Sequence, residues 1–199
     1  MRNKIILAMA AAGMMCATSA FAAVDHTQGP FGSGKVTFTG TITNSPCDIA
    51  PGDDDLTVKF GQISYRKLKE ANTADTQDVK PVTIHLQNCA FDAGGEGKPA
   101  LMSQVVVTFT GNTAPQSGDV AYPNTGGNGM AGGVGVQLLN SKMEKLSPAT
   151  LATTGTTPQQ LQNGDNQIQL FAQLINLGGA DSVVPGNISI PLNYTLTYN

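Results

Sequence analysis

The amino-acid sequence predicts an all-β protein, an antiparallel β-sandwich of about seven short strands. Its 23 Gly, 11 Pro and lack of Trp favour strands joined by turns over long helices. The strongest signal is at the C-terminus, where polar and apolar residues alternate without a break over 187–198. Such alternation is typical of a strand with one buried face. A third indication is that two of the three cysteines remain once the predicted export signal is removed.

Residues 1–22 form a predicted secretory signal peptide. Arg2 and Lys4 precede an apolar run, and Ala20-Phe21-Ala22 supplies the small residues of a cleavage site before Ala23. The apolar run is too short to span a bilayer, and no other stretch approaches about 18 apolar residues. The sequence therefore predicts an exported protein that is not embedded in a membrane.

The mature chain is expected to be acidic. Loss of Arg2 and Lys4 leaves 9 of the 11 Lys and Arg residues against 14 Asp and Glu residues, a net charge of about −5. Phosphate binding needs a basic surface, so no nucleic acid is expected as a partner. About 177 residues remain, which fits one domain with a sizeable core.

Cys47 and Cys89 are the two cysteines that remain after cleavage. In an oxidising compartment an even pair predicts a disulfide bond. Two Cys and the distant His26 and His85 are too few ligands for a metal site. In the chain-entropy model, closing a loop of about 43 residues stabilises the fold by about 4 kcal/mol. The sequence thus predicts one disulfide, no metal and no cofactor.

A second alternating run, residues 35–43, lies near the N-terminus of the mature chain. Val36, Phe38, Gly40 and Ile42 share one of its faces, and Lys and Thr residues form most of the other. The apolar face of the C-terminal run consists of Ile188, Ile190, Leu192, Tyr194, Leu196 and Tyr198. Pro191 cannot donate a ladder hydrogen bond, so one side of this run is expected to be a sheet edge. A long apolar edge strand is prone to aggregation unless another segment covers it. Each of the two end runs could provide that cover for the other.

Five further strands are predicted between the two end runs. They are residues 56–60, 79–89, 104–110, 134–139 and 167–177, separated by turn-rich stretches at 92–99, 114–133 and 153–165. Val82, Ile84 and Leu86 share one apolar face of the strand at 79–89. Residues 64–74 have room for one short helical turn.

Three motifs that suggest chemistry are better explained as structural features. Residues 127–132 fit a dinucleotide-binding pattern, but no strand precedes them and no helix follows, so they are interpreted as a flexible surface loop. Asp53-Asp54-Asp55 lacks the spacing of a calcium loop and is interpreted as a solvated turn. His85 falls on the outward face of its strand and His26 lies in the polar leader. No nucleophile can be placed beside either histidine, so no catalytic residue is predicted.

Several short motifs, taken in their order along the chain, match one known family. They are Gly34-Lys35-Val36-Thr37-Phe38-Thr39-Gly40, Pro46-Cys47, Phe60-Gly61-Gln62-Ile63, Leu86-Gln87-Asn88-Cys89, Gly186 and the penultimate Tyr198. In this order and spacing the chain resembles the pilins, the structural subunits of chaperone-usher fimbriae of Gram-negative bacteria. The resemblance covers essentially the whole mature chain and is strongest to shaft-type pilins such as those of type 1 and P pili.

The resemblance implies an incomplete immunoglobulin-like sandwich that lacks its final strand and has a groove beside its C-terminal strand. A periplasmic chaperone would lend a strand to this groove. At an outer-membrane usher, the N-terminal extension of the next subunit would replace that strand. The implied domains are a signal peptide at 1–22, an N-terminal extension that acts as donor strand at 23–43, and a pilin domain at 44–199.

The same resemblance assigns roles to single residues. Val36, Phe38, Gly40 and Ile42 would be the donor side chains that enter a neighbouring pilin's groove, with Gly40 over a shallow position. The acceptor groove and chaperone contact would be formed by Ile188, Ile190, Leu192, Tyr194, Leu196, Tyr198 and Asn199. The implied function is that of a polymerising, non-enzymatic subunit, exported through the periplasm to a surface fimbria that supports bacterial adhesion.

Two other functions stay open. Alternation identifies a strand but not its partner, so the two end runs could instead pair within one complete, monomeric sandwich. The chain could also be a carbohydrate-binding, lectin-like sandwich or tip adhesin, although tip adhesins of this family generally have two domains and about 177 residues leave room for one. An enzyme is the least supported class.

Overall fold

The computed structural model describes residues 34–98, 100–112, 119–125 and 127–199. The predicted signal peptide and the leader with His26 lie outside the described residues. By their contacts the residues divide into two units, Met1–Ile42 and Thr43–Asn199. The described part of the first unit forms no helix or strand, and its Val36, Phe38 and Ile42 side chains are exposed.

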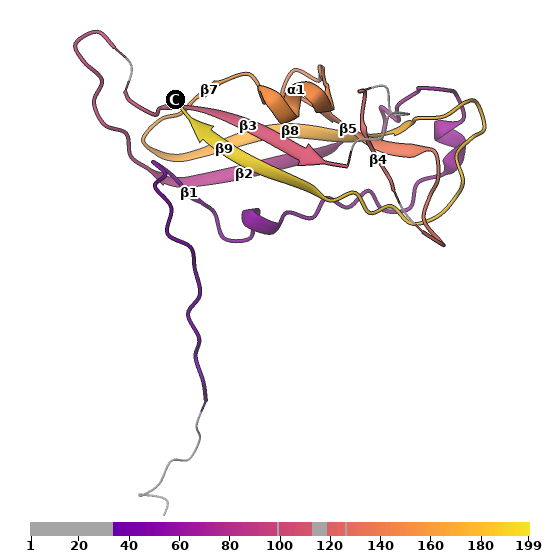
Figure 1. Cartoon of the computed structure of the whole chain (residues 1–199), viewed down its shortest axis with the longest axis horizontal. Helices are drawn as coiled ribbons and strands as arrows, with labels where there is room; N and C mark the ends of the chain where they lie inside the picture. Colours follow the sequence, from indigo (N-terminus) through magenta and orange to yellow (C-terminus); the bar gives the residue numbers. More distant parts are fainter. Residues whose placement is uncertain (1–33, 99, 113–118, 126) are drawn as a thin grey trace, which may run out of the picture. The chain divides into compact units, whose positions relative to one another are not determined.

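Residues 43–199 fold into two antiparallel sheets (Figure 1). One sheet has the strand order β1-β2-β8-β5-β4, with β6 paired to β5, and the other has the order β7-β3-β9. The strands are β1 Asp48–Ile49, β2 Lys80–Cys89, β3 Gln104–Gly111, β4 Tyr122–Pro123, β5 Val134–Leu139, β6 Lys145–Leu146, β7 Gln159–Gln160, β8 Gly164–Asn176 and β9 Leu192–Tyr198. The predicted all-β, antiparallel class is confirmed.

The long strands lie where the sequence predicts them, and one predicted strand is wrong. The strands β2, β3, β5 and β8 match the predicted ranges to within a few residues, whereas the two-residue strands β1, β4, β6 and β7 are too short to leave a periodic signal. Residues 56–60 form no strand. Of the alternating apolar side chains, Phe60 packs against the core and Val58 is half-buried, whereas Leu56 is exposed, and the segment has no pairing partner among the described residues.

Three short helices interrupt the strands. The 3-10 helix η2, Tyr65–Leu68, confirms the helical turn predicted in 64–74, and Ser64 caps it by accepting a hydrogen bond from the Arg66 amide at 3.4 Å. The acidic triplet forms a second 3-10 helix, η1 Asp53–Asp55. The helix α1, Pro148–Thr153, is not predicted, although Ser147 as N-cap and Pro148 at the first position are a typical start signal. No helix among the described residues is long and apolar enough to span a membrane.

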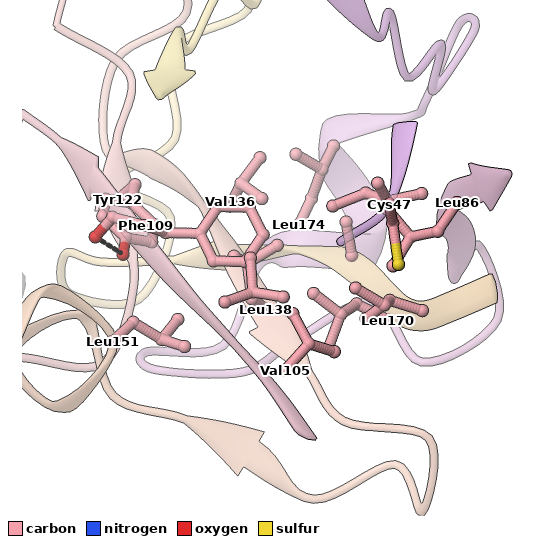
Figure 2. Close-up of a cluster of buried hydrophobic side chains, with 14 of the residues drawn as sticks. Cys47, Leu86, Val105, Phe109, Tyr122, Val136, Leu138, Leu151, Leu170 and Leu174 are labelled. Atoms are coloured by element: carbon pink, nitrogen blue, oxygen red, sulfur yellow. Dashed lines mark hydrogen bonds between the residues drawn. The ribbon is translucent and has the colours of Figure 1, made fainter. Parts of the chain in front are cut away.

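The core lies between the two sheets and draws side chains from both (Figure 2). Leu86 of β2 and Val136, Leu138, Leu170 and Leu174 of β5 and β8 come from one sheet; Val105 and Phe109 of β3 come from the other. Tyr122 of β4 is also buried, and its hydroxyl donates a hydrogen bond to the Phe109 carbonyl at 3.3 Å. Burying one large apolar side chain stabilises a fold by about 1.5–3 kcal/mol, so this layer supplies the main driving force.

The predicted disulfide between Cys47 and Cys89 is confirmed, across a sequence separation of 42. Both cysteines are buried, and the bond joins the residue before β1 to the last residue of β2. The start of the sandwich is therefore attached covalently to the end of β2, the strand with which β1 pairs.

Replacement of Cys89 by Ser should lower the free energy of unfolding by about 2–5 kcal/mol, because the unfolded chain regains the freedom of the open loop. The measurement is a urea unfolding curve of the oxidised native chain against Cys89→Ser. Equal curves would show that the disulfide contributes nothing to stability.

Burial of the Tyr122 hydroxyl should make the folded chain less stable at alkaline pH. Burial, aided by the negative charge of Asp119, raises the pKa of Tyr122 to about 12, above its usual value of 10.0. The neutral hydroxyl is thus favoured in the folded state, so its contribution is complete below the unfolded pKa and is lost as the pH rises toward 12. From about pH 9 to about pH 11, the native chain should lose about 1 kcal/mol more than Tyr122→Phe. Parallel losses in urea titrations of both chains would contradict this.

An apolar groove beside the C-terminal strand as the candidate functional site

A long apolar groove of about 1460 Å³ lies between the two sheets. Residues 54–65 form one wall and residues 183–194 form the other. The floor consists of core side chains, among them Val82, Ile84, Phe109, Val134, Val136, Leu138, Ala172 and Leu174. These floor residues belong to β2, β3, β5 and β8, so both sheets contribute to it.

The first part of the site is β9, an edge strand. Among the described residues β9 pairs with β3 alone, and its other edge has no neighbouring strand. Its inward side chains Leu192, Tyr194, Leu196 and Tyr198 are only half-buried, while the side chains between them are exposed. The alternation read from the sequence is confirmed over these residues. An apolar face that stays half-covered and a main-chain edge without a partner are the two features that an added strand would satisfy.

The wall continues toward the N-terminal side of β9 as an irregular segment rather than as a strand. The predicted C-terminal strand starts at Leu192, not at Asn187, because residues 184–187 bond to the loop at 129–132. The Asn187 amide donates to the Gly129 carbonyl at 2.9 Å, and the Ala131 amide donates to the Asn187 carbonyl at 2.8 Å. These bonds use the main-chain groups that a longer strand would need.

Asn124 holds this irregular segment in place. Its side-chain amide donates to the Ala131 carbonyl at 2.7 Å and to the Asn187 carbonyl at 3.1 Å. Its side-chain oxygen accepts from the Ser189 amide at 3.0 Å. The glycine-rich stretch at 127–132 is a loop, as predicted, but it is not simply a flexible surface loop. Two β-bridges tie it to residues 184–187, and Ala131 lines the groove.

The opposite wall consists mainly of residues 56–63. None of these residues makes a main-chain hydrogen bond within the described part of the chain, and none belongs to a strand. Two of their side chains, Phe60 and Ile63, still pack against the core and are partly buried. Both walls of the groove therefore present main-chain donors and acceptors above an apolar floor. This arrangement suits one extended peptide segment.

The structure brings together four of the predicted acceptor residues. Ile188, Ile190, Leu192 and Tyr194 line the groove. Leu196 and Tyr198 pack against the core outside the groove lining, and the main chain of Asn199 exchanges two hydrogen bonds with Gln104, at 2.9 and 3.1 Å. Sequence reasoning missed the wall at 56–63 and residues 183–187. The Phe60-Gly61-Gln62-Ile63 motif lies in that wall, but the motif alone does not predict that its residues line a groove.

Asp53 lies at the end of the groove where Tyr194 reaches across it. The Tyr194 hydroxyl donates to the Asp53 carbonyl at 2.8 Å. Burial raises the pKa of Tyr194, and the nearby charges of Asp53 and Asp54 raise it further, so the hydroxyl remains a neutral donor. The interpretation of the acidic triplet as a solvated turn is wrong for Asp53. Its carboxylate accepts a hydrogen bond from the His85 amide and lies 2.8 Å from His85 Nδ1. His85 itself is exposed, as predicted.

The groove carries no arrangement that suggests catalysis. Within the described ranges, no three His, Cys, Asp or Glu side chains gather as a metal site would require. Its lining is dominated by aliphatic and aromatic side chains.

Comparison with known proteins gives a consistent result. A family model described as fimbrial protein matches residues 36–199. The chain is 32% identical to Fimbria A protein of Serratia marcescens over 84% of its own length and 85% of that protein. It is 29% identical to Major MR/P fimbria protein of Proteus mirabilis over 98% of both chains.

Solved structures agree with the sequence relatives. A chain in the structure of a chaperone-usher pilus is similar with a TM-score of 0.69 at 26% identity, covering 86% of this chain and 99% of that one. The P pilus rod subunit PapA shares the fold, with a TM-score of 0.59 at 23% identity over 78% of this chain and 100% of its own. The predicted immunoglobulin-like class of pilins is confirmed.

Gly186 offers a test of how the irregular wall is held. A Cβ atom at Gly186 would lie 2.4 Å from the Met130 carbonyl carbon and 2.5 Å from the Ala131 amide nitrogen. Gly186→Ala should therefore push the wall off the 127–132 loop and lower the free energy of unfolding by about 1–3 kcal/mol. Gly127→Ala is the control, because its Cβ would meet nothing within 4 Å. Urea unfolding compares them, and equal stability of both variants would rule out the steric role of Gly186.

Proposed function

The chain belongs to the fimbrial protein family, as a structural, non-enzymatic pilin of the chaperone-usher type, and from this premise we propose that it polymerises by donor-strand exchange into a surface fimbria. The observation that carries the proposal is the groove, which has room for one extended segment between two walls. In the proposed fibre, residues 35–43 of one copy, or the equivalent segment of another pilin, fill the groove of a neighbouring subunit.

Donor and acceptor agree in length and in chemistry. The inward positions of the β9 wall from Ile188 to Tyr194 and the alternating positions from Val36 to Ile42 both span seven residues, about 20 Å of extended chain. Each set contains four alternate positions, and in the donor set one of them is Gly40, which has no side chain. The match in length supports one donor strand per groove.

The exposed donor side chains supply an energetic reason for assembly. Val36, Phe38 and Ile42 are 75%, 91% and 102% exposed in this chain. Burying each of them in a groove stabilises the assembly by about 1.5–3 kcal/mol. Newly formed main-chain hydrogen bonds add about 1 kcal/mol each. No chemical reaction is needed to drive such a fibre.

The remaining steps follow from the same proposal. The signal peptide at 1–22 is removed on export, residues 23–43 form the N-terminal extension, and residues 44–199 form the pilin domain. In the periplasm a chaperone strand covers the groove and the face formed by Leu196 and Tyr198, and basic chaperone residues hold the Asn199 carboxylate. At the outer-membrane usher, the extension of the next subunit replaces the chaperone strand. Adhesion is then a property of the whole fibre.

The structure favours this polymer over the two alternatives. In a complete monomeric sandwich residues 35–43 would be a strand, whereas they form none in this chain. The match to a major fimbria protein over 98% of both chains supports a shaft subunit over a two-domain tip adhesin. A shaft or adaptor subunit is therefore the proposed role.

Gly40→Arg should block polymerisation and leave the subunit's own fold intact. Within this chain a Cβ at Gly40 meets nothing within 4 Å, so the side chain has room. In a neighbour's groove the guanidinium would be a buried, unpaired charge, which costs several kcal/mol. Assembly is followed by electron microscopy and gel analysis of fibres, and the fold by urea unfolding.

Gly34→Arg is the matched control, because Gly34 also has no atom within 4 Å and lies outside the alternating run. It should polymerise normally. Fibres of Gly40→Arg would remove the donor-strand assignment, and a loss of stability in the Gly40→Arg subunit would favour the monomeric sandwich.

A further inference from the structure

The groove wall at 56–63 lies across the groove from β9. Its main chain makes no hydrogen bond to either sheet within the described residues. Its position must therefore be set by the side chains it buries and by its two ends.

One end is held by η2 and the core. Leu68 is buried, and its carbonyl accepts a hydrogen bond from the buried side chain of Asn176 at 2.9 Å. The Lys67 amide donates to the Ser64 carbonyl at 3.0 Å, which closes the helical turn that follows the wall.

The other end is held by Asp53. Its carboxylate accepts from the His85 amide and contacts His85 Nδ1 at 2.8 Å, which ties η1 to the middle of β2. Its amide donates to the Ala50 carbonyl at 3.0 Å. Its own carbonyl is the acceptor for the Tyr194 hydroxyl at 2.8 Å. Asp53 therefore links β2 in one sheet to β9 in the other.

Tyr194 is well placed for this link. It lies on the inward face of β9 opposite Phe109 of β3, and the two ring centroids are 6.4 Å apart. Its ring lines the groove. In the described part of the chain, its hydroxyl makes the single side-chain hydrogen bond that joins η1 or the 56–63 wall to β9.

We propose that Tyr194 and Asp53 form a clasp that sets the width of the groove and so positions the 56–63 wall for an incoming strand. The proposal rests on the proposed donor-strand function and adds two positioning residues to it. With the clasp formed, the wall is preorganised beside β9, and the incoming strand does not have to order it. Without the clasp, the wall stays attached through η2 and its buried side chains but moves more freely at the Asp53 end.

The first arm of the test measures the wall in the absence of any donor. Trypsin cleaves after Lys59, an exposed residue within the wall, and after Lys142, an exposed residue in a distant turn. In Tyr194→Phe the ratio of cleavage after Lys59 to cleavage after Lys142 should rise about fivefold, the effect of losing one hydrogen bond from a locally opening segment. Tyr122→Phe is the matched control, because it removes a hydroxyl-to-carbonyl bond in the core and should leave this ratio unchanged.

The second arm measures strand acceptance with a synthetic peptide of residues 34–43. All chains carry Gly40→Arg, so that their own extension does not compete for the groove. The peptide should bind Tyr194→Phe about fivefold more weakly than the parent chain, and Tyr122→Phe should bind it like the parent. Asp53→Ala should resemble Tyr194→Phe, and Asp53→Asn, which keeps an oxygen for the His85 amide, should restore most of the affinity.

The outcomes separate the two proposals. An unchanged cleavage ratio in Tyr194→Phe would overturn the clasp, whatever the peptide does. A raised ratio with unchanged peptide affinity would overturn its role in positioning the strand. If the parent chain binds no peptide at all, the donor-strand function itself fails, and the cleavage ratio still reports whether the Tyr194 bond holds the wall.

Discussion

The structure depends on one unsatisfied edge. β9 is bonded to β3 on one side, and on the other side its main chain and its half-buried apolar face have no strand to complete them among the described residues. Exposure of the apolar floor to water is unfavourable, and the unpaired main-chain groups of the edge are a template for pairing with a suitable extended segment.

The two walls of the groove are built by different means. The β9 wall is a regular strand that continues as an irregular segment, which Asn124 and the 127–132 loop hold by hydrogen bonds. The 56–63 wall has no main-chain hydrogen bonds to other described residues and is attached at its ends, by η2 on one side and by Asp53 on the other.

In the proposed function, the same simple pattern serves both as donor and as acceptor. Alternation of apolar and polar residues produces an apolar face on residues 35–43 and another on β9. Neither apolar face is fully buried within the single chain. In the proposed fibre each face is completed by the other, from a different copy. Folding energy that the single chain does not realise becomes the energy of assembly.

By itself, the sequence determined the all-β class, the disulfide between Cys47 and Cys89, the four long internal strands and the apolar face of β9. These features follow from local periodicity or from residue counts, which a sequence carries directly. Only the tertiary structure decided that residues 56–60 are a groove wall and not a strand, that the 127–132 loop anchors the residues before β9, and that Asp53 meets both His85 and Tyr194. Each of these depends on contacts between segments far apart in the chain, and periodicity reports which side of a segment is buried but not what lies against it.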